Sequence, residues 1–161
     1  MPDSKAPGKF ALALMSVPVP WVFVLTYLMG GVLESIFHLG KFANYRLLTP
    51  TGSLLFILGG ALAAWGWLIF RSRGTTRVPG ETSSTLVTWG PYEFTRNPMY
   101  VGLAVAYLGE ACLLHQVIPV ILLPLPIAYL NQFVIPIEEE RLRAVFGHEY
   151  EGYAGRVRRW L

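Results

Sequence analysis

Charge and cysteine are both scarce in this chain. Only 14% of its 161 residues are Asp, Glu, Lys or Arg, whereas 53% are hydrophobic and the mean hydropathy is +0.46. This composition is too apolar for a soluble domain of this length, so it indicates an integral membrane protein. The single cysteine, Cys112, excludes an internal disulfide framework and a multi-cysteine zinc site. We expect one all-α, polytopic membrane domain over residues 1–161.

Four apolar runs dominate what is present. Each lies near or above the length that crosses about 30 Å of hydrocarbon. They cover residues 10–30, 53–70, 99–115 and 117–135. Only a few residues separate the last two runs, which predicts a helical hairpin. Prolines interrupt the first and fourth runs, so we expect a kink near Pro18 and Pro20 and bends in the fourth helix.

Small residues recur in the second run, at Gly59, Gly60, Ala63, Ala64 and Gly66. Small residues four apart let two helices approach closely in lipid. A phosphate-binding loop would instead need a strand before the glycines and a Gly-x-Gly spacing at the start of a helix. The pattern therefore predicts helix packing.

Basic residues are distributed by loop rather than as one stripe, which argues against a nucleic-acid partner. Eleven of the 13 Lys and Arg residues flank the runs on one side, and only Lys41 and Arg46 lie on the other. The positive-inside rule then places both termini and the loop 71–98 in the cytoplasm. We expect a bacterial-type inner membrane.

Polar segments flank the runs. Residues 1–9 are predicted to form a disordered leader, and residues 31–49 have the spacing of a short amphipathic helix at the membrane interface. The loop 71–98 begins as a linker and regains aromatic residues, so its second half is expected to be ordered. The tail 136–161 predicts a helix that ends at Gly147 as its C-cap.

The stretch from Gly90 to Gly102, GPYEFTRNPMYVG, lies where the long loop meets the third run. Pro98 disfavours helical geometry at Asn97, so the third helix is predicted to begin directly after it. This places Arg96 and Tyr100 at the mouth of the span, either as ordinary interface anchors or as part of a polar site.

This stretch and the tail together resemble the superfamily of isoprenylcysteine carboxyl methyltransferases and phospholipid N-methyltransferases. The resemblance covers roughly residues 86–161. The family's Arg-His-Pro-x-Tyr-x-Gly box corresponds to Arg96, Asn97, Pro98, Tyr100 and Gly102. The paired acids and the tail motifs correspond to Glu138, Glu139, Gly147, Tyr150, Tyr153, Arg156 and Val157. Asn97 departs from the family histidine, because its amide forms hydrogen bonds but cannot become charged.

The resemblance implies an S-adenosylmethionine-dependent transferase with a lipid-like or apolar acceptor that enters between helices. The acceptor group stays open among carboxylate, amine and thiol. Arg96 and Arg156 are the expected catalytic residues, because a guanidinium grips a carboxylate or phosphate with two hydrogen bonds. The expected cofactor-binding residues are Tyr92, Asn97, Pro98, Tyr100, Gly102, Glu138, Glu139 and Tyr150. For Glu138 and Glu139 the reason is that a carboxylate accepts both ribose hydroxyls.

Two other functions stay open on the sequence. One is an NADPH-dependent membrane reductase of related architecture, and the other is a non-catalytic membrane interaction module. No cluster of Cys, His and Asp has the spacing of a metal site, so metal chemistry has little support. Glu110 lies inside the third run and is either a functional carboxylate or one that reaches the outer interface.

Overall fold

The computed structural model describes residues 18–37, 45–72 and 85–161, and every regular element within them is a helix. The expected leader 1–9 and the first half of the long loop fall almost entirely outside these residues. The elements are α2 (Val19–Phe37), α3 (Tyr45–Ser72), η1 (Gly90–Glu93), α4 (Pro98–Leu113), α5 (Val117–Leu122), α6 (Pro124–Tyr129), η2 (Leu130–Val134), α7 (Ile135–Phe146) and α8 (His148–Ala154).

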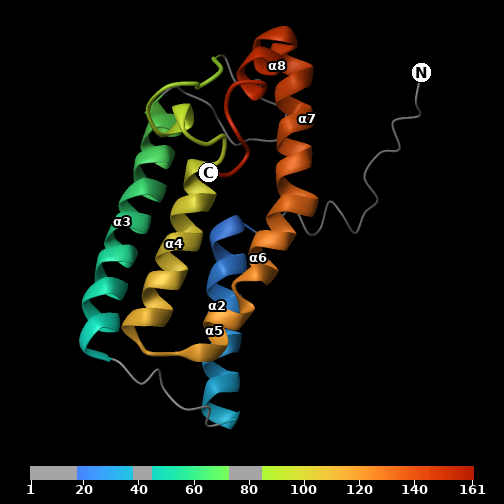
Figure 1. Cartoon of the computed structure of the whole chain (residues 1–161). Coiled ribbons are helices and arrows are strands. Elements are labelled where there is room, and N and C mark those ends of the chain that lie inside the picture. The colour runs from blue at the N-terminus through green and yellow to red at the C-terminus, as the bar shows by residue number, and fades with distance from the viewer. Residues whose placement is uncertain (1–17, 38–44, 73–84) are drawn as a thin grey trace.

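Three of the helical segments are long and apolar enough to cross a membrane. They are Val19–Phe37, Arg46–Arg71 and the run Val117–Phe146, while the apolar helix α4 is shorter at 16 residues. Figure 1 shows α3 and α4 side by side, with α2 and the run from α5 to α7 beside them. The prediction of an all-α polytopic membrane protein is confirmed.

The first span differs in its bounds from the prediction. Helix α2 begins at Val19, so Pro20 stands in its first turn, where a missing N–H costs no helical hydrogen bond. Within the described residues these prolines therefore start the helix rather than kink it. The helix also continues past Gly30 to Phe37, so residues 31–37 belong to a span and not to a separate interfacial helix. Residues 38–44 of that expected helix lie outside the described part.

Glycines bring α3 and α4 into backbone contact. A Cβ added at Gly59 would lie 2.4 Å from Ala106 N, and one at Gly102 would lie 2.5 Å from Ala63 N. Gly52 and Gly109 meet in the same way further along the pair. Since any side chain at these positions would push the helices apart, the predicted packing role of the small residues is confirmed. Gly60 is the exception, because nothing lies within 4 Å of its added Cβ.

The chain reverses after α4 through a short turn at Leu114 to Gln116 and runs back as α5, α6, the π-helical turn η2 and α7. The expected bend appears at Leu123, between α5 and α6, directly before Pro124. The helix of the fourth apolar run does not end near Ile135 but continues to Phe146. Pro136 removes one backbone N–H, and the π-turn accommodates this with a bond from Ile135 N–H to Leu130 O, so the helix continues.

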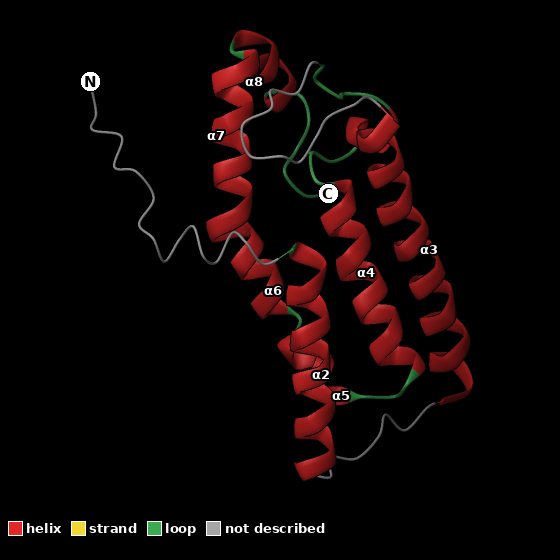
Figure 2. Ribbon diagram, turned by 180° about the vertical axis from the view of Figure 1, so that it is seen from behind, coloured by secondary structure: helices red, strands yellow, loops and turns green. Residues whose placement is uncertain are grey.

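Helix α2 packs against α5 and α6 (Figure 2). The carboxylate of Glu34 accepts hydrogen bonds from Val117 N and Ile118 N at 3.1 and 2.7 Å. Tyr27 donates to Gln116 Oε1 at 2.7 Å. The Glu34 carboxylate thus supplies acceptors for backbone N–H groups in the first turn of α5, which have no partner within the helix itself.

Candidate functional site

The site begins where α4 starts. Asn97 occupies the N-cap position with φ −129° and Pro98 is the first helical residue, as the sequence predicted. The segment before it, from Thr85 onward, is ordered and includes the short helix η1. The buried Tyr92 of η1 donates to Gly66 O at 3.3 Å and thereby ties this segment to the end of α3.

The tail folds back over this segment. Helix α7 ends at Phe146, and Gly147 follows with a φ of +51°, which confirms the predicted C-cap. Helix α8 then buries Tyr150 and Tyr153. Tyr153 donates to Tyr92 O at 2.8 Å, which joins the tail to η1. Burial raises the pKa of Tyr153 above its ordinary value, so the hydroxyl stays protonated and donates.

Glu139 is the centre of the polar contacts. It is only 5% exposed. Arg96 Nη1 lies 3.1 Å from its Oε1, and Arg143 Nη2 lies 3.5 Å from its Oε2. Arg159 binds both oxygens, with Nε 3.0 Å from Oε1 and Nη2 2.8 Å from Oε2. Three guanidinium groups therefore surround one carboxylate.

Arg96 and Tyr150 complete this cluster. Arg96 Nη1 also donates to the Tyr150 hydroxyl at 3.2 Å. Burial, followed by the nearby Glu139 charge, raises the pKa of Tyr150, which keeps its phenol neutral beside the carboxylate. The Arg96 side chain is 14% exposed, and its Nε is buried without a hydrogen-bond partner among the described residues.

Glu138 lies beside this cluster with different surroundings. Its Oε1 accepts a hydrogen bond from the buried Tyr100 hydroxyl at 2.7 Å. The residue itself is exposed, in contrast to Glu139. This bond joins α4 to α7, two helices that do not pack along each other.

The segment after α8 is bound to the box through its backbone. Arg96 N donates to Arg158 O at 2.9 Å. Thr95 Oγ1 and Asn97 Nδ2 both donate to Arg159 O, at 3.1 and 2.9 Å. The Asn97 amide thus donates to a backbone carbonyl, and this hydrogen bond does not require a charged side chain.

The structure brings most of the predicted residues together but leaves two apart. Arg156 is exposed, and its Nε donates to Gly152 O at 3.2 Å within its own helical turn. Arg159 takes the place beside Arg96 that the sequence assigned to Arg156. Gly102 faces Gly59 and Ala63 of α3, so its lack of a side chain serves the packing of the two helices. Glu110 lies at the opposite end of α4, partly buried.

Sequence reasoning missed two members of the cluster. Arg159 stands among other basic residues of the tail, and nothing in its sequence neighbourhood separates it from Arg158. Asn131 lies near the end of the fourth apolar run, and its Oδ1 accepts from Arg159 Nη1 at 3.1 Å and from Trp160 Nε1 at 3.4 Å. In the sequence, the one feature that points to Arg159 or Asn131 is that each is a polar residue within or close to the tail.

This geometry defines a class: a polytopic helical membrane protein with a charged site at one end of its bundle, where the box and the tail meet. The particular family follows from comparison. The chain belongs to the phospholipid methyltransferase family, which it matches over residues 48–149. It is thus a member of a family of membrane methyltransferases.

Curated proteins that resemble this chain include two named as methyltransferases and one named for metal resistance. The chain is 26% identical over 140 residues to a probable protein-S-isoprenylcysteine O-methyltransferase from Oryza sativa, in both the indica and the japonica subspecies, covering 85% of the chain and 73% of the relative. It is 30% identical over 138 residues to the cobalt-zinc-cadmium resistance protein CzcN of Cupriavidus metallidurans, covering 85% of the chain and 59% of the relative.

Proposed function

We propose that this protein transfers a methyl group from S-adenosylmethionine to a lipid-like or apolar acceptor at the charged end of the bundle. The family supports the reaction class, and the rice relatives are named for methylation of an isoprenylcysteine. The carboxylate, amine and thiol classes of acceptor are all compatible with this proposal. The bound cofactor would supply an electrophilic methyl group on a sulfonium.

The observation that carries the proposal is the unmet donor of Arg96. A buried N–H without a partner is costly, so native sites that retain one commonly hold a ligand or water there. Arg96 also keeps a fixed orientation through Glu139 and Tyr150. A rigid guanidinium with a free donor fits an anionic oxygen, such as an acceptor carboxylate, a headgroup phosphate or the cofactor carboxylate.

The residues that would hold the cofactor lie around Arg96. Glu138 is exposed and can be reached by the ribose hydroxyls, whereas Glu139 is buried among arginines. Tyr100 and Tyr150 present rings and hydroxyls beside these carboxylates. Asn97 and Pro98 form the turn on which α4 begins. We assign Gly102 to helix packing and Tyr92 to anchoring this turn.

The chain's own residues would act through alignment. Methyl transfer is an in-line displacement, and it needs the acceptor atom, the methyl carbon and the leaving group held in one line. Arg96 would hold the anionic group of the acceptor, while the carboxylates and tyrosines fix the other side. A positive guanidinium repels a sulfonium, so Arg96 is suited to the acceptor side of the site.

We also propose that this end of the bundle faces the cytoplasm. The end of α3, the start of α4 and the tail lie at the same end in Figure 1, and they carry most of the basic residues. The positive-inside rule favours that orientation. S-adenosylmethionine would then reach the site from the compartment in which it is made.

The test is calorimetry on detergent-solubilised protein with S-adenosylhomocysteine, the product form of the cofactor. We expect saturable binding, and a loss of affinity of roughly tenfold or more in Glu138→Gln, since a hydrogen bond to a charged group is worth about 1.5 to 3 kcal/mol. NADPH is the control ligand and should not bind. Binding of NADPH without S-adenosylhomocysteine would overturn the proposal.

A further inference from the structure

Arg159 lies near the end of the tail and is partly buried, and its side chain makes several contacts in the site. Its guanidinium places Nε and Nη2 on the two oxygens of Glu139, at 3.0 and 2.8 Å, and Nη1 on Asn131 Oδ1 at 3.1 Å. Every nitrogen of the group is used, and the paired bonds form the planar fork that an arginine makes with a carboxylate.

The helix that carries these partners is built to receive this fork. Asn131 and Glu139 are eight residues apart, which leaves them about 80° apart around a regular α-helix. The π-turn Leu130–Val134, which contains Asn131, has more residues per turn than an α-helix and so reduces this rotation. Both side chains therefore come close to one face, where both bind Arg159.

We propose that Arg159 is a positioning residue of the cofactor site, which fixes Glu139 on α7 and thereby the place of its neighbour Glu138, the carboxylate assigned to the ribose. Through Glu139 it also orients Arg96 on the acceptor side. This inference rests on the proposed function, because it assigns Arg159 a part in that same site. Arg159 itself does not touch the reacting atoms.

The charges explain why Glu139 needs this partner. Arg96 contacts Glu139 through Oε1 alone, and Arg143 contacts it at 3.5 Å from a half-exposed side chain. Neither contact fixes the plane of the carboxylate. The fork from Arg159 does, because two parallel bonds define the plane and not only the distance. The hydrogen bond with Glu139 also raises the pKa of Arg159, so its charge is retained.

The backbone of the same residue holds the other side of the site. Arg159 O accepts from Asn97 Nδ2 of the box and from Thr95 Oγ1 directly before the box. Trp160 packs against the apolar core formed by α2, α4 and the returning helix. One residue thus links the start of α4 with α7, and a change in its side chain is transmitted to both.

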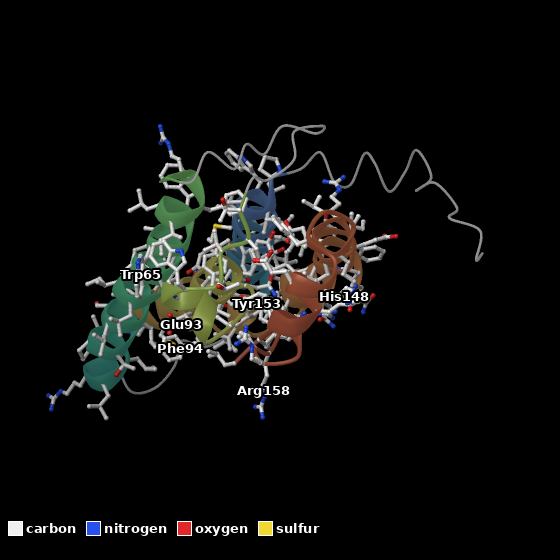
Figure 3. The ribbon with its side chains drawn as sticks, turned by 90° about the horizontal axis from the view of Figure 1, so that it is seen from above. Trp65, Glu93, Phe94, His148, Tyr153 and Arg158 are labelled. Carbon is white, nitrogen blue, oxygen red and sulfur yellow. The ribbon has the colours of Figure 1, made fainter. Side chains whose placement is uncertain are left out.

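Arg158 provides a matched control. It carries the same charge one residue earlier, it is exposed, and Figure 3 shows its side chain pointing away from the bundle. Its backbone carbonyl binds Arg96 N, and a substitution of the side chain leaves that bond in place. Any effect of net charge or of lipid attraction should therefore be equal in Arg158→Gln and Arg159→Gln.

The experiment measures the affinity for S-adenosylhomocysteine by calorimetry, together with the melting temperature, in full-length variants. Arg159→Gln should weaken binding by about tenfold or more, the size expected for losing charge-assisted bonds, whereas Arg158→Gln should stay within about twofold of the wild type. Arg159→Lys keeps the charge, so it preserves the fold even if Arg159→Gln does not, and it should still bind several-fold more weakly because it lacks the fork.

A double variant tests the route through Glu139. If Arg159 acts through that carboxylate, Arg159→Gln combined with Glu139→Gln binds no more weakly than Glu139→Gln alone. Additive losses would show that Arg159 acts by another route. A lower melting temperature with unchanged affinity in Arg159→Gln and Arg159→Lys would reduce Arg159 to a structural contact. A wild type that binds no S-adenosylhomocysteine would overturn both this inference and the proposed function.

Discussion

The α3–α4 interface and the charged end of the bundle are held together by opposite means. Along α3 and α4, glycines such as Gly59 and Gly102 remove side chains so that backbones touch. At the charged end, α7 is joined to the box by long polar side chains, chiefly through Glu139. The first arrangement is rigid and tolerates no added atom, whereas the second is specific in direction and can exchange a partner for a ligand. The candidate site therefore lies at the end of the bundle where polar side chains, rather than close backbone packing, hold the helices together.

The largest loss of stability is expected from breaking the close-packed region. Gly102→Ala would place a methyl group 2.5 Å from Ala63 N and 2.6 Å from Gly59 O. Because backbone atoms cannot move aside as a side chain can, the helices must separate, at a cost of about 3 kcal/mol or more. Gly60→Ala is the control, since its new methyl group meets nothing. Thermal unfolding in detergent measures both, and equal melting temperatures would contradict the account.

The next effect comes from the charged end. Glu139→Gln removes the carboxylate that faces three guanidinium groups and leaves Arg96 buried without its partner, at a cost of about 2 to 3 kcal/mol. Limited proteolysis should then release the tail after α7 before the helices unfold. A variant whose tail resists protease as well as the wild type would show that the charges do not hold this end.

A smaller effect is expected from the single bond between Tyr153 and Tyr92. Tyr153→Phe should cost about 1 kcal/mol at neutral pH, because it leaves a buried carbonyl without its donor. It should also alter the response to alkali. An unfolded tyrosine ionises near pH 10, and burial raises the pKa of Tyr153 above that. Its contribution is therefore complete below about pH 10 and is lost as the pH rises. Urea titrations at pH 8 and pH 11 should show a smaller pH effect in Tyr153→Phe than in the wild type.

The smallest effect is expected at Arg156. It is exposed, and its Nε donates to Gly152 O within its own turn, so Arg156→Gln should change the affinity for S-adenosylhomocysteine by less than about twofold. Calorimetry decides this. A large loss would return Arg156 to the site and show that the tail rearranges on binding.

The sequence predicted the parts that depend on local chemistry. Proline fixed the start of α4 at Pro98, a positive-φ glycine ended α7 at Gly147, and small residues indicated where α3 meets another helix. These signals act within a few residues of one another. The resemblance in the box and tail added the family, which the match over residues 48–149 confirms.

The features of the fold and the site that the sequence could not predict depend on contacts between residues far apart in the chain. Pro136 and the change in composition after it suggested the end of a span, but a π-turn carries the helix through. Arg156, Arg158 and Arg159 look alike in the sequence, and only the path of the tail decides which one meets Glu139. Gly102 fits a motif and a packing contact equally well until α3 is placed beside it.

Methyl transfer itself tests the central claim most directly. Labelled S-adenosylmethionine is incubated with purified protein in vesicles that contain either phosphatidylethanolamine or an S-isoprenylcysteine, and the extracted product is counted. We predict transfer to one of these acceptors by the wild type. Arg96→Lys should lower turnover by about a hundredfold with nearly unchanged cofactor affinity, because the fork that aligns the acceptor is lost. Turnover that survives in Arg96→Lys at high cofactor concentration, together with a strongly weakened cofactor affinity, would contradict the assignment of Arg96 to the acceptor.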